Sequence, residues 1–212
     1  MSDTRYEKKD YPTLRGASPG RPPRSDHEIE AFRAHIGAQA LELYLRKGAD
    51  AVSMREIART AGCSPATLYA HFAGKADILL YLWAFVLDEM IATIEAAASS
   101  PDGDALSEAS QAFVGYWTAH PDRFRLVFMS AGVARADVST IMSDPRTKGH
   151  FDRFRDLLAR AVPMTQTEAS VRTDTLIAGL IGVSLCLVTI KDHDWPATAE
   201  MVDQIVRGAT AR

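Results

Sequence analysis

Cysteine is nearly absent from this sequence: the 212 residues hold only Cys63 and Cys186, which lie far apart. This speaks against a disulfide scaffold and against a cysteine-based metal site. No secretory signal pattern is visible, so we expect a reducing, cytoplasmic location. For Cys63 we weigh an oxidation sensor against a small buried hydrophobe and favour the hydrophobe.

Motifs for catalysis are also missing. The sequence has no glycine-rich phosphate loop, no nucleophile elbow, no cysteine–histidine pair and no internal repeat. None of its six histidines has a second one at metal-binding spacing, and the triplet Asp192-His193-Asp194 is typical of a polar loop. We therefore expect no enzyme, no metal and no cofactor.

What is present describes a globular chain whose charge is unevenly divided. Hydrophobic residues make up 47% and charged residues 24%, which suits a chain that buries a substantial core. The net charge of −3 is composed of +2 over residues 1–80 and −5 over residues 81–212. This asymmetry favours a first part that faces nucleic acid and a second part that does not.

The segment from Ser53 to Lys75 predicts two short helices joined by a tight turn. Ser53 and Glu56 are spaced as a capping box, and Gly62 supplies the backbone freedom of the turn. Ser64 is a second helix cap, with a proline directly after it at the first helical position. This is the pattern of a helix-turn-helix, whose second helix enters the major groove of DNA.

The outward side of that second helix argues for DNA rather than for an ordinary helical hairpin. Leu68 and Phe72 pack it inward, which leaves small, aromatic and imidazole groups outside. A solvated helix would normally carry Glu and Lys at these positions.

The run from about Ile36 to Leu79 resembles the DNA-binding domain of the TetR/AcrR family of bacterial regulators. The resemblance is carried by Gly48, Ile57-Ala58, Ala61-Gly62-Cys63-Ser64, Leu68-Tyr69, His71-Phe72 and Lys75. It implies that Lys75 and Tyr69 hold phosphates and that Thr67 and His71 lie near base edges or the backbone. The segment Pro65-Ala66-Thr67 departs from the family, which often has a glycine before the threonine equivalent, and we expect this to alter base contacts rather than the fold.

Lys75 also stands out without the resemblance. A cation in the first turn of a helix opposes the helix dipole, and an arriving phosphate would neutralise it, although a plain surface lysine is the alternative. The full set of residues that we expect at DNA is Arg21, Arg24, Ser53, Arg55, Ser64, Ala66, Thr67, Tyr69, Ala70, His71 and Lys75.

Residues 1–25 form a proline-containing arm with six basic and three acidic residues. Arginines on a stiff extended backbone suit a narrow minor groove, and a solvated tail with incidental charge is the equal alternative.

The whole chain is expected to be all-α, with no strand pattern and about nine helices. The three-helix helix-turn-helix domain would cover residues 26–75, and a helical domain for ligand binding and dimerisation would cover residues 76–212. The expected helices after the motif cover residues 75–98, 105–119, 121–132, 145–161, 165–191 and 196–207. The helix that starts at Lys75 would be shared between the two domains.

The second domain is rich in aromatic residues and methionine, which predicts a core and a cavity for an apolar or amphipathic ligand. The candidate ligand residues are Trp83, Met90, Phe113, Tyr116, Trp117, Phe128, Met129, Phe151 and Cys186. No residue from 175 to 190 is charged, and the polar and glycine interruptions argue for burial rather than for a membrane span.

The family places its dimer interface on the last two helices, so the resemblance implies a homodimer there. The candidate interface residues are Thr175, Ala178, Gly179, Gly182, Val183, Cys186, Met201 and Ile205. We expect a dimeric regulator, a repressor released from a palindromic operator by a small effector. The alternative is a DNA-binding helical adaptor or nucleoid-associated factor without a small-molecule ligand.

Overall fold

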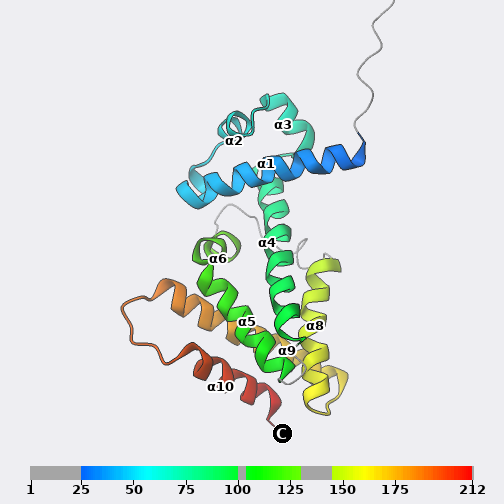
Figure 1. Cartoon of the computed structure of the whole chain (residues 1–212), viewed down its shortest axis with the longest axis vertical. Coiled ribbons are helices and arrows are strands. Elements are labelled where there is room, and N and C mark those ends of the chain that lie inside the picture. The colour runs from blue at the N-terminus through cyan, green and yellow to red at the C-terminus, as the bar shows by residue number, and fades with distance from the viewer. Residues whose placement is uncertain (1–24, 100–103, 130–144, 212) are drawn as a thin grey trace, which may run out of the picture.

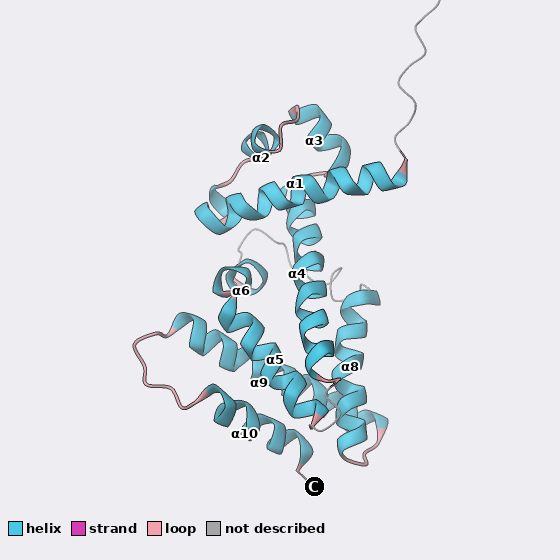
Figure 2. Cartoon of the chain, viewed as in Figure 1, coloured by secondary structure: helices cyan, strands magenta, loops and turns pink. Residues whose placement is uncertain are grey.

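The computed structural model describes residues 25–99, 104–129 and 145–211. Over these residues the chain forms nine α-helices and one short 3₁₀-helix, with no strand (Figure 2). The expected all-α fold is therefore confirmed. The helices form a small head of three, a long connecting helix and a helical body, as seen from top to bottom in Figure 1.

The head consists of α1 (Asp26–Lys47), the 3₁₀-helix η1 (Ala49–Ala51), α2 (Met54–Thr60) and α3 (Pro65–His71). Ser25 and Glu28 form a complete capping box at the start of α1. Gly48 and Gly62 have φ angles of 80° and 67°, a conformation that L side chains rarely adopt, at the two sharp turns. The head core is built from one side of each helix: Ile36, Ala40, Leu43, Tyr44, Ile57, Ala58, Leu68 and Phe72.

The cap of α2 differs from the expected capping box. Ser53 accepts a hydrogen bond from the backbone N–H of Glu56, but no reciprocal bond from Glu56 to Ser53 is formed. The Glu56 carboxylate instead accepts a bond from Lys47 Nζ at 2.6 Å. Half of the predicted box is thus wrong, because a lysine at the end of α1 competes for the carboxylate.

The long helix α4 (Lys75–Ala97) belongs to both parts of the molecule. Its first turns place Ile78, Leu79 and Leu82 in the head core. Its later turns place Met90 and Ile94 in a second, separate core. The helix is therefore shared between the two cores, and the head core continues past residue 75, where we expected the domain boundary.

The body contains α5 (Ala105–Ala119), α6 (Pro121–Phe128), α8 (Pro145–Ala161), α9 (Gln166–Thr189) and α10 (Thr198–Thr210). Aromatic and aliphatic side chains fill its core, including Phe113, Trp117, Phe124, Phe154, Leu176 and Leu180. Several helix ends differ from expectation; the largest differences are that α6 ends at Phe128 and that α10 continues through Gly208 to Thr210. Buried Ala209 anchors that last turn, and Arg172 donates to its carbonyl at 2.9 Å.

Within the described residues, α9 is the one helix whose length and composition would let it cross a membrane. In its most apolar window, 39% of the residues are buried inside the chain. Leu176, Leu180 and Val188 from this helix belong to the body core. We therefore interpret α9 as a core helix of the bundle.

Candidate DNA-binding surface

The second helix of the motif, α3, presents one buried side and one open side. Leu68 is fully buried, as is the capping residue Phe72. On the other side Tyr69 is 55% exposed, and Ala66 and Ala70 are exposed as well. This is the orientation that the sequence predicts, and it leaves the helix surface open for contact with a groove.

Thr67 lies at the start of α3 with its hydroxyl already oriented. Its backbone N–H donates to Ser64 Oγ at 3.0 Å, and the two hydroxyl oxygens are 2.9 Å apart. Because Ser64 caps the helix and also contacts Thr67, both side chains are held at the helix N-terminus. A hydroxyl retains further donor or acceptor capacity in this arrangement, and that capacity suits a base edge or a phosphate.

His71 is only half open. Its ring lies against Phe32 of α1, with ring centroids 4.9 Å apart in an edge-on arrangement. Its backbone carbonyl accepts a hydrogen bond from Arg33 Nη1. The residue expected at base edges therefore also joins α3 to α1.

Lys75 has partners that the sequence did not indicate. Its ammonium group donates to the carbonyl oxygens of Ala49 at 2.8 Å, Asp50 at 3.3 Å and Val52 at 3.5 Å. These carbonyls belong to η1 and to the residue that caps its end, where a cation is favourable. The unfavourable position of Lys75 in α4 is thus offset by contacts to another segment, and a phosphate contact by Lys75 stays a prediction.

Two more basic side chains of α1 hold carbonyls at the ends of the motif helices. His35 Nε2 is 3.2 Å from the carbonyl oxygen of Ala61, which caps α2. Arg33 reaches the last residue of α3. Sequence reasoning missed both residues, because they lie 26 and 38 positions away from their partners.

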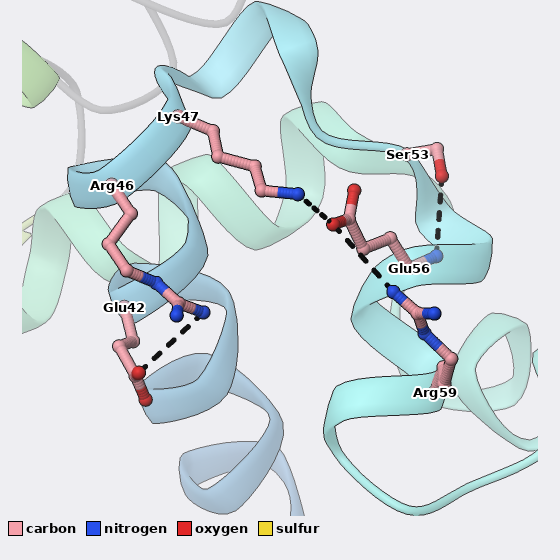
Figure 3. A network of polar contacts seen from close by, with 6 residues as sticks. All are labelled: Glu42, Arg46, Lys47, Ser53, Glu56 and Arg59. Carbon is pink, nitrogen blue, oxygen red and sulfur yellow. Dashed lines mark hydrogen bonds and ion pairs between the residues drawn. The ribbon is translucent and has the colours of Figure 1, made fainter.

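A polar network ties the end of α1 to the start of α2 (Figure 3). Glu56 lies between Lys47 at 2.6 Å and Arg59 at 3.9 Å, while Arg46 pairs with Glu42 on α1 itself. The hydrogen bond from Lys47 lowers the pKa of Glu56 below its ordinary value, and the charges of Lys47 and Arg59 act in the same direction. The network fixes α2 against α1 next to Ser53 and Arg55.

Ser53 and Arg55 are exposed beside this network, as a DNA contact requires. Arg21 and Arg24 lie outside the described residues. The structure therefore brings nine of the expected DNA residues onto α2, α3 and the start of α4, and the role of each at DNA stays a prediction.

Comparison with known proteins finds matches that include this part of the chain. Residues 36–82 match the family model described as "Bacterial regulatory proteins, tetR family". The helix-turn-helix head is therefore similar to the DNA-binding domain of TetR-family regulators. The matched residues run from the buried part of α1 through α2 and α3 into the first turns of α4.

Two curated relatives are transcription regulators. The transcriptional activator FasR of Mycolicibacterium smegmatis is 24% identical over 155 residues, which span 72% of this chain and 68% of the relative. The transcriptional regulator AcrR of Shigella flexneri is 33% identical over 60 residues, 28% of each protein. These relatives are DNA-binding regulators and not enzymes.

Solved structures share the fold over most of their length. A TetR-like regulator from Rhodococcus sp. RHA1 has a TM-score of 0.61 at 18% identity, covering 91% of this chain and all of that one. The TetR-family regulator PfmR of Thermus thermophilus has a TM-score of 0.54 at 19% identity, covering 84% and 92%. At such identities the likeness establishes a common fold only.

The expected ligand residues are mostly packed core. Phe113 and Trp117 are buried against one another, with ring centroids 6.2 Å apart, and Tyr116 donates its hydroxyl to the Val86 carbonyl at 3.3 Å. Trp83 lies in the head core and donates to the carbonyl of Leu126 on α6 at 3.1 Å. Met90 is core, Cys186 and Phe151 are half-buried, and Phe128 and Met129 are exposed.

A cavity of about 410 Å³ lies elsewhere, between the head and α6. Of the expected ligand residues only Met129 lines it. Its walls are Tyr44, Leu45, Gly48, Ala49 and Asp50 of the head and Asp122, Arg125, Leu126 and Met129 of α6 and its end. The aromatic set thus does not surround this cavity, because the aromatics fill the interior of the bundle.

The expected dimer residues separate into two groups. Thr175 and Ala178 are exposed on α9, and Gly182 has open space around it. Gly179 instead faces α10 of its own chain, where a Cβ would lie 3.0 Å from Ile205 Cγ2. Val183 is buried in the body core, and Cys186 and Met201 are half-buried. The small size of Gly179 therefore serves packing within the chain, and a role for it in a dimer interface stays a prediction.

An exposed stripe does run along α9. Val171 is 61% exposed and Leu185 is 41% exposed, on the same side of the helix as Thr175, Ala178 and Gly182. Sequence reasoning missed Val171 and Leu185, although their spacing along the helix could be recognised in the sequence.

No group of histidine, cysteine, aspartate and glutamate suited to a metal occurs among the residues that the structure describes.

Proposed function

We propose that this TetR-family regulator binds a palindromic operator as a homodimer and represses transcription until a small apolar or amphipathic effector releases it. The observation that carries the proposal is the open side of α3, with Tyr69 exposed and Thr67 held by Ser64 at the helix N-terminus.

DNA binding would divide between two kinds of contact. Arg55 and Tyr69 would contact phosphates, which give affinity without sequence preference. Thr67, Ala66 and Ala70 would contact base edges, where hydroxyl and methyl groups contribute preference for particular bases. Lys75 would contribute to phosphate binding through its charge while keeping its carbonyl partners.

Dimerisation would use the exposed stripe of α9 together with α10. Burying solvent-exposed apolar side chains of one helix face against a second copy of the chain is favourable. A two-fold axis there would present two heads to successive major grooves, with centres about 34 Å apart or a multiple of that.

For the effector we propose the cavity between the head and α6, which the exposed Met129 helps to line. Head residues form one wall and α6 forms the other. A ligand that fits one relative position of these walls better than another shifts the head, because coupling follows from differential affinity.

We propose repression rather than activation because it requires fewer contacts. Release requires only that DNA and effector favour different head positions, whereas activation requires a further surface for the transcription machinery. The relative FasR is an activator by name, so a reporter assay with and without effector must decide the sign.

The test begins with selection of duplexes from a random-sequence pool by the full-length protein at physiological salt. We expect enrichment of a palindromic sequence. Thr67→Val should change the enriched sequence, whereas Arg55→Met should weaken binding to all duplexes and reduce the salt slope by about 1. If no sequence is enriched over the random pool, the regulator function is wrong.

A helical adaptor or nucleoid-associated factor without a ligand is the second candidate, favoured by the packed aromatic core. A thermal-shift screen of lipophilic compounds separates the two, since a ligand bound only by the native state raises the melting temperature. Met129→Lys should abolish any such shift if the cavity is the site.

A further inference from the structure

Arg33 occupies the point where α1, α3 and α4 meet. Its Nη1 donates to the backbone carbonyl of His71, the last residue of α3. Its guanidinium carbon lies 4.2 Å from the centre of the Phe72 ring and 5.2 Å from that of Tyr81 on α4. One side chain thus contacts the end of the motif helix, its capping residue and the connecting helix.

We propose that Arg33 is a positioning residue, which fixes the direction in which α3 is presented to DNA. This inference rests on the proposed function. The chemistry favours arginine, because a planar cation can donate to a helix C-terminal carbonyl while it lies over aromatic rings. A lysine could supply the charge and one hydrogen bond, but not the planar contact.

The second contact of Arg33 is itself held in place. The Tyr81 hydroxyl donates to Glu30 Oε1 at 3.0 Å, and the other carboxylate oxygen of Glu30 is 4.0 Å from Arg33 Nε. The phenyl ring of Phe72 and the ring of Tyr81 meet edge-on with centroids 5.5 Å apart. Arg33 therefore connects α3 to a fixed part of α1 and α4.

The short length of α3 makes this connection matter. The helix has seven residues, and the Ser64 cap holds its N-terminus. Its C-terminal end is held by buried Phe72, by the edge contact of His71 with Phe32, and by Arg33. Without the guanidinium, the carbonyl of His71 loses this donor and the end of the helix can change its angle against α1.

A direct phosphate contact by Arg33 would be a different role, and the experiment separates the two. Two variants change the cation itself: Arg33→Met removes it and Arg33→Lys exchanges it. The control is Arg46→Met, which removes a cation from the same helix at a more exposed position, where Arg46 pairs with Glu42. Each full-length variant is measured against the duplex that the wild type enriches and against a random duplex pool, over a range of salt. Amide hydrogen exchange of α2 and α3 is followed without DNA.

For Arg33→Met we expect a loss of preference for the enriched duplex of about tenfold, with an unchanged salt slope on the random pool. Amides of α3 should exchange faster while those of α2 do not. Arg33→Lys should recover part of the preference, and Arg46→Met should keep all of it.

Other outcomes overturn the inference. A lower salt slope for Arg33→Met would assign Arg33 to a phosphate, and equal loss of protection in α2 and α3 would make it a general stability residue. If Arg33→Met changes neither the preference for the enriched duplex nor the amide exchange of α3, then Arg33 neither positions α3 nor stabilises the head. If the wild type enriches no duplex, the regulator function fails, while the exchange comparison still tests how Arg33 holds α3.

Discussion

Gly37 of α1 lies directly against the ring of Tyr81 on α4: a Cβ at Gly37 would be 2.8 Å from Tyr81 Cε1. Carbon atoms cannot approach so closely, so the crossing of these two helices requires glycine at this position. Because Tyr81 also contacts Arg33 and Glu30, the crossing fixes the head on the connecting helix.

We expect Gly37→Ala to destabilise the protein. Overpacking costs about 1–3 kcal/mol, and the better helix propensity of alanine offsets roughly 1 kcal/mol of that. Urea unfolding measures the change. Gly115→Ala in α5 is the matched control, since nothing lies within 4 Å of its Cβ position. Equal stabilisation by the two changes would show that the Gly37 crossing is not tight.

Lys75→Met should destabilise the head. The carbonyl of Ala49 would lose the ammonium donor at 2.8 Å and keep only the longer bond from the Val52 N–H at 3.4 Å. A hydrogen bond to a charged group contributes about 1.5–3 kcal/mol. Thermal unfolding measures the loss, and Lys191→Met, at an exposed position, should change stability by no more than about 0.5 kcal/mol. The same melting temperature for both variants would mean that the carbonyl contacts add nothing.

The pH dependence of Glu56 follows from its lowered pKa. A carboxyl whose pKa is lower when folded contributes stability above its unfolded pKa, and this contribution is lost as the pH falls through the folded value. We expect the loss below pH 4.5, the ordinary value of this group. Lys47→Met should raise the pKa of Glu56 because it removes the hydrogen bond that lowers it most.

Carbon-13 NMR titration of the Glu56 carboxyl measures this shift. Arg46→Met is the control, since the charge of Arg46 is the weakest of the influences that lower the pKa. A shift as large for Arg46→Met as for Lys47→Met would mean that general charge, not the hydrogen bond in Figure 3, controls the group.

Leu185→Lys should separate the proposed dimer. The charge would be placed in the exposed apolar stripe of α9, and burying an unpaired ammonium against a second copy is unfavourable. Sedimentation equilibrium should show a monomer for Leu185→Lys and a dimer for Ala159→Lys, a control at an exposed position of α8. A dimer of unchanged affinity would place the interface elsewhere.

Local signals in the sequence were sufficient for most of the fold. The box of Ser25 and Glu28, the cap at Ser64 and the positive-φ turn at Gly62 all act within a few residues. The apolar spacing of Leu68 and Phe72 likewise fixed which side of α3 is buried. Such features depend on neighbours along the chain, and so they could be predicted without a tertiary structure.

Packing decided what these signals could not. Glu56 prefers Lys47 to its own cap, Lys75 is held by the carbonyl of Ala49, and Arg33 reaches His71 across 38 positions of sequence. Packing also decided the surroundings of Gly179, which lies against the side chain of Ile205 in the same chain. The sequence alone determined which helices form and which faces they bury. Which side chains meet between those helices depends on crossing positions that arise only when the whole core is packed.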